Sequence, residues 1–447
     1  MTEAVAQKKN HYRSALAQME SRTAPDWLKR LRAEAAAQFD TLEFPHRKME
    51  EWRFTNVNPI VRTPFKSLTE PGECALSAED AAQYKYNVPG WTELVFVDGF
   101  HVESLSSFGA LPKKTFAGSL STALGKDALD IHEHLGKHAG QNGNIFNALN
   151  AAFLLDGGFV HVPKNTVVEA PIHLIHIMAE STGGSAAHPH GLVVLEEGAE
   201  ATVIETFVGA SDTTQYLNNA ATELSLGPNA KLDYYKIVEE GDSGYHLATA
   251  AGRMERDSVL NAYTCTLSGK IVRNAISIKL DGENAECNLN GLYLLEQEQL
   301  VDNNTFIEHA APHCTSWIGY KGVLDDKSHG VFSGRIYVHR AAQKTDSKQL
   351  NGNLLLSDRA TIDTKPLLEI FADDVKCTHG ATIGRPPSQQ IFYFQSRGID
   401  KKRAEGLLTY GFAGEIVGLI KIDAIRERLD KYAFNKYCAR ERVQVDR

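Results

Sequence analysis

The chain has 447 residues, of which 43% are hydrophobic and 23% are charged, and its formal net charge is −9 at pH 7. This composition is typical of a folded globular protein and excludes global disorder. The excess of acidic residues argues against nonspecific binding to nucleic acid or to an anionic membrane. A membrane span is excluded too, because Glu415 interrupts the most apolar stretch, Phe412 to Ile420, well short of the ~18 residues required.

Residues 1–60 are expected to form a helical region. Pro25 and Asp26 open a segment whose apolar residues recur at the three- to four-residue steps of an amphipathic helix, namely Trp27, Leu28, Leu31, Ala35 and Phe39. Phe44-Pro45 ends this pattern. The first residues contain no apolar signal core, and the six cysteines include no CxxC pair, so we expect reduced thiols in a cytoplasmic protein.

Residues 61–156 read as a mixed α/β lead-in. A strand is expected at Leu94 to Phe100, and a short helix in the histidine-rich stretch from Ile131 to His138. Neither pattern is long enough to define a fold of its own, so we expect this region to lead into the segment that follows.

Residues 157–398 change to short alternating strands separated by tight polar turns. The turns recur in kind at intervals of roughly 25 to 30 residues, which is the signature of stacked repeats: Gly198–Ala201, Gly227–Ala230, Arg256–Val259, Gly282–Ala285 and Ser357–Ala360. We therefore predict a mainly β protein with a β-solenoid core. A β-sandwich is the alternative for the same short strands.

Residues 399–447 are expected to be helical again. Asp400 is the predicted N-cap of a helix with an apolar stripe, Ala404, Leu407, Leu408, Phe412 and Ile416. A second helix is predicted to bury Ile425, Leu429 and Tyr432 on one face.

Motifs for nucleotide hydrolysis and for acyl transfer are absent. The nearest match to a phosphate-binding loop runs from Gly118 to Lys126, but it has two residues too many, and Asp127 replaces the Ser or Thr that would hold magnesium. No GxSxG nucleophile elbow occurs. The pairs His132/His134 and His188/His190 could ligate zinc, although paired histidines are more often structural.

Cys377-Thr378-His379 is the sharpest chemical signal. In a strand, alternation sends Cys377 and His379 to the same face, where a thiolate and an imidazole could hold iron or another soft metal. A buried cysteine beside a hydrogen-bonded histidine is the structural alternative. Cys265, Cys287 and Cys314 lie near the repeat spacing and could stack, with His309 and His313 nearby, but filling of the core is the favoured explanation.

Several segments around this motif resemble the SufB/SufD family of the SUF machinery for iron–sulfur cluster assembly. The resemblance runs in order through residues 300 to 415 and is carried by Lys365–Ile370, Asp373–Thr382 and Phe392–Gly398, with Asp302, Asn304–Thr305, Glu308–His309, Gly330–Gly334 and Leu354–Ser357. Lys48–Thr55 resembles the N-terminal stretch of SufD-type chains. Gly380 follows His379 where SufB-like chains tend to carry Glu, so this chain is most similar to the SufD type.

The resemblance implies a right-handed parallel β-helix flanked by helical ends, without catalytic activity of its own. It implies a SufB-like paralogue and a SufC-type ABC ATPase as partners, and leaves open a homodimer of the isolated chain. Cys377 and His379 would meet ligands of the paralogue and share a transient iron–sulfur cluster or iron. A reduced flavin in the complex stays open, and no tightly bound cofactor is expected in the isolated chain.

The resemblance also implies that the C-terminal region docks the ATPase. The expected contacts are Ser396, Arg397 and Gly398, followed by Leu407, Leu408 and Phe412. The apolar stripe suits a helix-in-groove contact, and packing back onto the solenoid is the alternative.

Two other classes compete with a scaffold. A β-helix enzyme acting on polysaccharide would need grouped acidic residues on a solenoid face, whereas the acidic doublets Asp325-Asp326 and Asp373-Asp374 are expected in turns. A stand-alone metal-binding redox protein would need a closed set of ligands within this chain.

Overall fold

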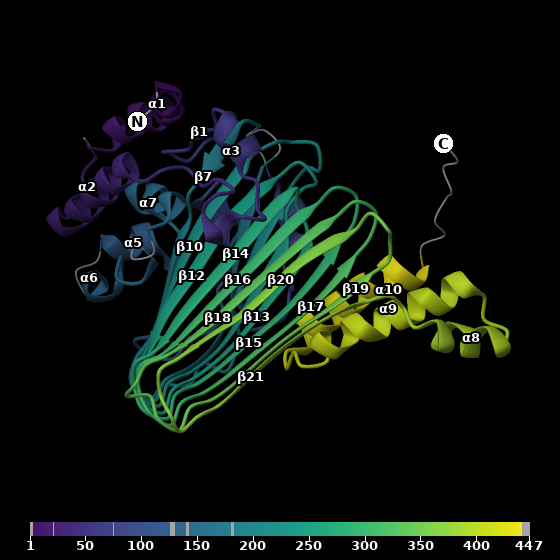
Figure 1. The fold of residues 1–447 in the computed structure, drawn as a ribbon. Coiled ribbons are helices and arrows are strands. Elements are labelled where there is room, and N and C mark those ends of the chain that lie inside the picture. Colours follow the sequence, from purple (N-terminus) through teal and green to yellow (C-terminus); the bar gives the residue numbers. More distant parts are fainter. Residues whose placement is uncertain are drawn as a thin grey trace.

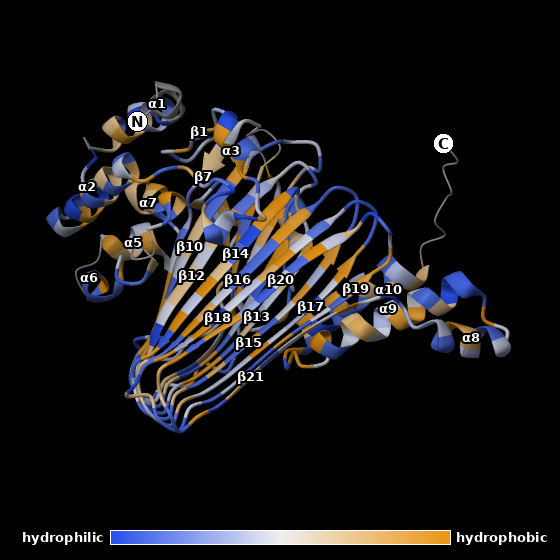
Figure 2. Cartoon of the chain, viewed as in Figure 1, coloured by the Kyte–Doolittle hydropathy of each residue, from blue (hydrophilic) through white to orange (hydrophobic). Residues whose placement is uncertain are grey.

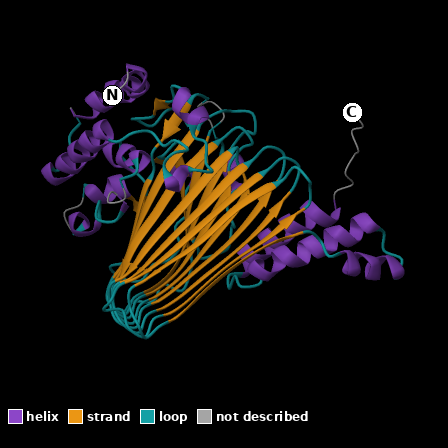
Figure 3. Cartoon of the chain, in the orientation of Figure 1, coloured by secondary structure: helices purple, strands orange, loops and turns teal. Residues whose placement is uncertain are grey.

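The computed structural model of this chain describes residues 3–20, 22–74, 76–125, 130–139, 143–179 and 183–439. Its centre is a long solenoid built from two sheets, with helices gathered at the N-terminal side and at the C-terminal end (Figures 1 and 3). Within the described ranges, no helix has the length and apolar character needed to cross a membrane.

Successive strands of the solenoid alternate between the two sheets. One sheet has the order β20-β18-β16-β14-β12-β10-β8-β5-β4, and the other has the order β21-β19-β17-β15-β13-β11-β9-β6-β2-β3. The pairs from β5/β6 to β20/β21 make eight turns of parallel strands. The predicted β-solenoid is thereby confirmed, and the β-sandwich is wrong because every turn contributes one parallel strand to each sheet.

The strands of the first sheet and its margin have the following bounds: β1 Lys66–Ser67, β4 Phe116–Ser119, β5 Gly158–Val162, β7 Ser185–Ala187, β8 His190–Leu195, β10 Leu217–Leu226, β12 Tyr245–Met254, β14 Ile271–Leu280, β16 Leu300–His309, β18 His329–Val338 and β20 Thr361–Ile370. Those of the second sheet are β2 Thr92–Val97, β3 Phe100–His101, β6 Ile172–Met178, β9 Glu200–Gly209, β11 Lys231–Glu239, β13 Val259–Ser268, β15 Glu286–Leu295, β17 Thr315–Leu324, β19 Asp346–Leu355 and β21 Lys376–Gly384. The lead-in thus supplies the first strands of both sheets.

Turns at one corner of the solenoid stack on each other through main-chain hydrogen bonds. Asn229 N–H donates to Arg256 O and Asp257 N–H donates to Glu283 O, both at 2.9 Å. Asn229 and Asp257 have φ of 57° and 58°, a left-handed conformation that Asn and Asp tolerate better than most residues. The sequence predicted that the turn Ser357–Ala360 belongs to the same series, and this is wrong. Ser357–Ala360 joins β19 to β20 at the opposite corner of the solenoid.

The interior is filled by rows of inward side chains, one residue from each turn. Two tyrosines fill their rows by lying over a glycine of the neighbouring strand. Tyr320 is the register partner of Gly291, and Tyr293 that of Gly322. A Cβ on Gly322 would lie 2.1 Å from Tyr293 Cε2, so the ring occupies the volume that a larger residue would need.

Most of the N-terminal helices pack beside the first sheet, whereas the short helix α4 contributes Ala81 to an apolar cluster with β2, β6 and β9 of the second sheet. They are α1 Glu3–Glu20, α2 Asp26–Thr41, α3 Asn58–Arg62, α4 Ala78–Ala82, α5 Leu120–Leu124, α6 Ile131–His134 and α7 Ile145–Ala152, with single 3₁₀ turns at Glu50–Trp52 and Glu103–Leu105. The predicted helix after Pro25 is confirmed as α2, which buries Leu28, Ala35 and Phe39.

The segment Lys48–Thr55 fastens the N-terminal region to the outer face of the first sheet. The Arg273 guanidinium lies 4.0 Å from the centroid of the Trp52 ring, a cation–π contact. Thr55 Oγ1 donates a hydrogen bond of 2.5 Å to Asp302 Oδ2. This segment therefore has a structural role that its sequence alone does not show.

The C-terminal helices are α8 Ser388–Ser396, α9 Lys401–Val417 and α10 Asp423–Phe434, followed by a π-helical turn at Asn435–Ala439. Asp400 is the N-cap of α9, as predicted, and its Oδ1 accepts from Arg403 N at 3.0 Å. Helices α9 and α10 pack against the outer face of the second sheet, where orange apolar segments of helix and strand meet in Figure 2.

The buried face of α9 differs from the predicted stripe. It consists of Ala404, Gly406, Thr409, Ala413, Ile416 and Val417. Leu407, Leu408 and Phe412 are half-buried at its margin. In α10, Ile425 and Leu429 are buried as predicted, whereas Ala433 takes the place expected for Tyr432.

Candidate functional site

The last turn of the solenoid, formed by β20 and β21, is an open end. Among the described strands, β20 pairs only with β18 and β21 pairs only with β19, so each has one free edge. Apolar side chains are exposed here, including Ile383 at 52% and Phe371 at 55%. Unpaired edges flanked by exposed apolar groups are typical of a surface that binds another chain.

The free edges of β20 and β21 differ. Thr361 N–H donates to Ser328 O, directly before β18, and Phe371 N–H donates to Val338 O, the last residue of β18. Alternation along a parallel strand therefore turns the main-chain groups of the even-numbered residues of β20 toward the free edge. Pro366 lies there and has no N–H to offer. In β21, Lys376 N–H donates to Thr345 O at 2.8 Å, so the odd-numbered residues face the free edge, without an intervening proline.

Cys377 and His379 lie on the same face of β21, two residues apart. Their register partners on β19 are Ser347 and Gln349, which are both fully buried. Cys377 is half-buried against the last layer of the main core, whereas His379 is exposed. Burial raises the pKa of the Cys377 thiol, the Asp346 carboxylate raises it further, and a backbone hydrogen bond from Ser347 works in the opposite direction.

These two residues provide two donors that are suited to a soft metal. The described part of the chain contains no group of three or more His, Cys, Asp or Glu residues arranged to hold a metal ion. Within the described residues, Cys377 and His379 thus form at most half of a ligand set. Completion of the set would require further donors.

A hydrogen-bonded row runs inside the solenoid below Cys377. His309 Nε2 lies 2.8 Å from Ser316 Oγ, and Ser316 Oγ lies 2.6 Å from Ser347 Oγ. Burial lowers the pKa of His309 to about 4, so this imidazole is neutral at physiological pH. These hydrogen bonds hold Ser347, the register partner of Cys377, in place. The only sign of this chain of hydrogen bonds in the sequence is the spacing of about one turn between Ser316 and Ser347.

The other sequence candidates belong to no metal-ligand group among the described residues. His188 contacts Ser67 Oγ at 3.0 Å, and His190 Nε2 contacts Glu223 Oε1 at 2.9 Å, so both are structural. His134 Nδ1 lies 3.1 Å from Ser225 Oγ. Since neither pair belongs to a group of three ligands in the described ranges, the zinc hypothesis finds no geometric support.

The structure does not bring the three mid-chain cysteines together. Cys265 is paired in register with Leu292, and Cys287 is paired with Leu260 and Ser316. Cys314 lies in the turn before β17 and donates to Gly282 O at 3.3 Å. His313 is exposed in that same turn. These residues fill the core or turns, in agreement with the explanation that the sequence favoured.

The near-match to a phosphate-binding loop and the acidic doublets also lack a site geometry. Gly118 lies in β4 and Gly125 caps the five-residue helix α5, while Lys126 and Asp127 lie outside the described residues. Both acidic doublets lie in turns, as expected, and Asp374 pairs with Lys344. The ionic pairing of the second doublet is of the kind found on solvated turns.

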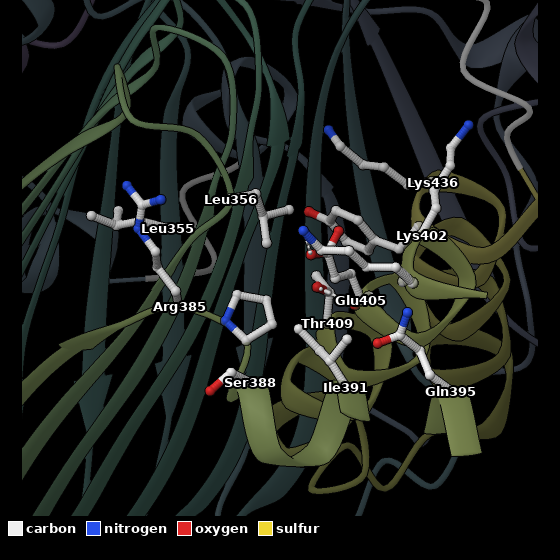
Figure 4. A pocket seen from close by; sticks show the side chains of 14 residues that line it. Leu355, Leu356, Arg385, Ser388, Ile391, Gln395, Lys402, Glu405, Thr409 and Lys436 are labelled. Carbon is white, nitrogen blue, oxygen red and sulfur yellow. Dashed lines mark hydrogen bonds and ion pairs between the residues drawn. The ribbon is translucent and has the colours of Figure 1, made fainter. Parts of the chain in front are cut away.

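The C-terminal candidates lie beside a groove of about 570 Å³ between the open end and α8–α9 (Figure 4). Ser396 at the end of α8 is exposed, as are Arg397 and Gly398 in the turn between α8 and α9. Phe412 lies under the Lys321 ammonium, which is 4.2 Å from the ring centroid, so this side chain packs back onto β17. Phe392 and Tyr393 on α8, which were not among the predicted docking contacts, are 72% and 57% exposed.

Comparison with known proteins agrees with this architecture. The description "SUF system FeS cluster assembly, SufBD core domain" matches residues 176–412, and "SufBD protein N-terminal region" matches residues 3–174. The chain belongs to the SufBD family. This assignment confirms the resemblance inferred from the motifs around Cys377, and it places the chain among proteins of iron–sulfur cluster assembly.

Curated relatives cover most of both chains. An iron–sulfur cluster assembly SufBD family protein of Synechocystis is 31% identical over 418 residues, 92% of this chain and 91% of its own length. The iron–sulfur cluster assembly protein SufD of Escherichia coli is 31% identical over 387 residues, 86% of this chain and 87% of its own. SufD of Bacillus subtilis is 26% identical over 433 residues, 92% and 94% of the two chains.

Proposed function

We propose that this SufBD family chain is a noncatalytic, SufD-like scaffold subunit that joins a SufB-like paralogue at its open end and docks a SufC-type ABC ATPase at its C-terminal helices. Its cargo is an iron–sulfur cluster or iron, held transiently between the two solenoids. The observation that carries the proposal is the position of Cys377 and His379 on β21, the last strand, beside a free edge.

The open end offers what a second solenoid needs. Main-chain groups along the free edge of β21 can pair with a strand of the partner, as in other cases of strand addition. The exposed side chains of Ile383, Leu350 and Phe371 would be covered in the same contact. Burial of these side chains contributes roughly 25 cal/mol for each Å² of apolar surface removed from water.

The half-set of ligands explains why the site would be shared. A thiolate and an imidazole from this chain leave coordination positions for donors from the paralogue. A cluster in such a joint is released when the joint opens, because half of its ligands leave with each subunit. Cys377 and His379 therefore serve as ligands, and no turnover is assigned to them.

The docking of the ATPase is proposed for the exposed turn Ser396–Gly398 together with the aromatic pair on α8. Leu407 and Leu408 remain candidate contacts because they are half-buried at the margin of α9. Removal of everything after Ile399 is a poor test, since α9 and α10 cover apolar residues of β15 and β17. Arg397→Glu is sharper because Arg397 is exposed and its guanidinium lies 5.4 Å from the centroid of the neighbouring Tyr393 ring, away from the contacts of α9 and α10 with the sheet.

The ligand role is tested with Cys377→Ala and His379→Ala in the complex reconstituted from this chain, the paralogue and the ATPase. Both variants are expected to assemble normally and to lose cluster formation, measured by visible absorption and iron content. Cys74→Ala is the matched control, because Cys74 is exposed in a loop of the lead-in. Cluster yields equal to the wild type in both variants would remove these residues from the chemistry.

The docking role is tested by copurification. Arg397→Glu is expected to weaken capture of the ATPase while leaving binding of the paralogue unchanged. Arg340→Glu, an exposed charge reversal in the turn after β18, is the control. Equal capture of the ATPase by Arg397→Glu and Arg340→Glu would exclude the turn from the docking surface.

A further inference from the structure

A second groove, of about 540 Å³, lies on the outer face of the first sheet, apart from Cys377 and from the C-terminal helices. Strands β12 to β20 supply its floor. The segment Glu50–Trp52 and Asn144, the N-cap of α7, line it from the N-terminal region. Small-molecule sites have volumes of about 300–1,000 Å³ and often lie where separate structural units meet. The groove has both properties, so its lining decides which ligand it fits.

The floor of this groove is one aromatic ring among polar side chains. Phe306 of β16 lies in register with Ser277 of β14 and with Arg335 of β18. Two residues earlier, Asn304 lies in register with Ser333. All five line the groove and are half-buried, because strand alternation turns them to the outer face. Phe306 therefore offers an apolar surface bordered by hydroxyl, amide and guanidinium groups.

The polar groups of the floor have hydrogen-bonding capacity to spare. The side chains of Ser277, Asn304 and Ser333 form no hydrogen bond with any other described residue. Arg335 Nη2 donates to Glu369 Oε2 at 2.7 Å, and the Arg335 guanidinium lies 5.3 Å from the centroid of the Phe306 ring. Hydroxyl and amide groups both donate and accept, so the floor can bond a ligand that does the same.

The charges around the floor cancel. Three ion pairs surround it, Arg273–Asp302, Arg335–Glu369 and Lys365–Glu50. Each cation is matched by a carboxylate, and the exposed Glu51 adds a further negative charge. The groove therefore has no positive field that would attract an anion. Each ion pair also places donors and acceptors side by side at the rim of the floor.

We propose that this groove binds a neutral saccharide, with the apolar face of one sugar ring on Phe306. Every sugar hydroxyl is both a donor and an acceptor, which matches the free groups of Ser277, Asn304 and Ser333 and the paired charges around them. The C–H face of the ring is apolar and would cover the exposed part of Phe306, removing both surfaces from water. This binding is independent of the proposed scaffold role.

Binding, and not hydrolysis, is assigned to the groove. Glycoside hydrolysis requires a carboxylic acid whose pKa is raised, so that it can donate a proton to the leaving group. The hydrogen bond and the charge of Lys365 instead lower the pKa of Glu50. The other carboxylate of the rim, Glu369, is held by Arg335. Both groups therefore serve as hydrogen-bond acceptors.

The test is titration calorimetry of the full chain with four neutral trisaccharides, built from glucose, mannose, galactose or xylose. Phe306→Ala removes the ring of the floor. Asn304→Ala removes an amide that has no partner within the described chain, so it keeps the test valid if Phe306→Ala loses the fold. Phe108→Ala is the matched control, because Phe108 is 57% exposed and lies outside the groove. Thermal unfolding verifies the fold of each variant.

At least one trisaccharide is expected to bind. Phe306→Ala and Asn304→Ala are each expected to raise its dissociation constant about 3- to 10-fold, and Phe108→Ala is expected to leave it unchanged. A trimer of glucuronic acid is expected to bind more weakly than the neutral sugars, because the groove lacks a positive field. Absence of binding by all four neutral trisaccharides would overturn the proposal. Wild-type affinity in both groove variants, or tighter binding of the charged trimer, would overturn it as well.

Discussion

Ala381→Pro tests the proposed strand pairing without disturbing the solenoid. Ala381 is one of the odd-numbered residues of β21, whose N–H groups point away from β19. Proline at this position removes no hydrogen bond of the β19–β21 ladder, just as Pro366 removes none of the β18–β20 ladder. The preceding residue is Gly380, which has no Cβ to clash with the proline ring.

The expected effect on binding follows from the hydrogen bonds that the partner would lose. A strand paired along this edge loses the Ala381 donor and, because the ring occupies the edge, about one neighbouring bond. At about 0.5–1.5 kcal/mol each, the loss is about 1–3 kcal/mol, which raises the dissociation constant for the paralogue about 5- to 150-fold. Thermal unfolding of the isolated chain is expected to stay at the wild-type temperature.

Thr382→Pro is the matched control for this experiment. The N–H of Thr382 faces β19 by the same alternation, so proline there breaks the ladder inside the chain and lowers the unfolding temperature. The assay is titration calorimetry or analytical size exclusion with the purified paralogue. Wild-type affinity in Ala381→Pro, with an intact fold, would refute pairing along the edge of β21.

Two further predictions concern the body of the solenoid. Gly322→Ala places a methyl group 2.1 Å from Tyr293 Cε2 and is expected to destabilise the fold by about 1–3 kcal/mol in chemical denaturation. Gly72→Ala is the control, because a Cβ at Gly72 meets nothing within 4 Å. Equal stability of the two variants would contradict the packing of Tyr293 over Gly322. Burial lowers the pKa of His188 to about 3, below its ordinary 6.5. The folded state therefore excludes a proton that the unfolded state binds, and stability is lost as the pH falls from about 6.5 toward 3, by about 2 kcal/mol at pH 5 from this residue. His188→Gln should flatten the fall of the unfolding free energy between pH 7 and pH 5, and an unchanged slope would show that His188 is not the group responsible.

The solenoid could be predicted from the sequence because its signals are local. Turn residues such as Asn229 and Asp257 recur once per turn, and strand alternation needs only neighbouring residues. The same alternation predicted that Cys377 and His379 share one face of a strand. The open end did not, because whether a strand is the last in its sheet depends on what the following residues do in space.

Contacts between turns escaped prediction because register sets them. The hydroxyls of Ser316 and Ser347 form a hydrogen bond between the neighbouring strands β17 and β19. Lys236 lies beside Glu205 on the neighbouring strand, and burial lowers the pKa of Lys236 to about 7. The register is also why Cys265 and Cys287 do not stack, although their spacing is close to one turn.

Helix α9 shows a different limit. Its apolar residues nearly encircle the helix, so periodicity indicated a stripe, whereas the second sheet selected small residues such as Ala413 for close approach. Phe412, expected in that stripe as a docking contact, lies at the margin under Lys321. Packing against the second sheet therefore determines which face of α9 is buried, and hydropathy alone does not predict that face.

The most direct test of the proposed joint is amide hydrogen exchange of β21 in this chain alone and in complex with the paralogue. We expect the N–H groups of Cys377, His379, Ala381 and Ile383 to exchange rapidly in the isolated chain and to become protected in the complex. The alternate amides of β21, already bonded to β19, serve as internal controls. Rapid exchange of all four amides in a complex that is stably assembled would contradict the claim that the open end is where the two subunits meet.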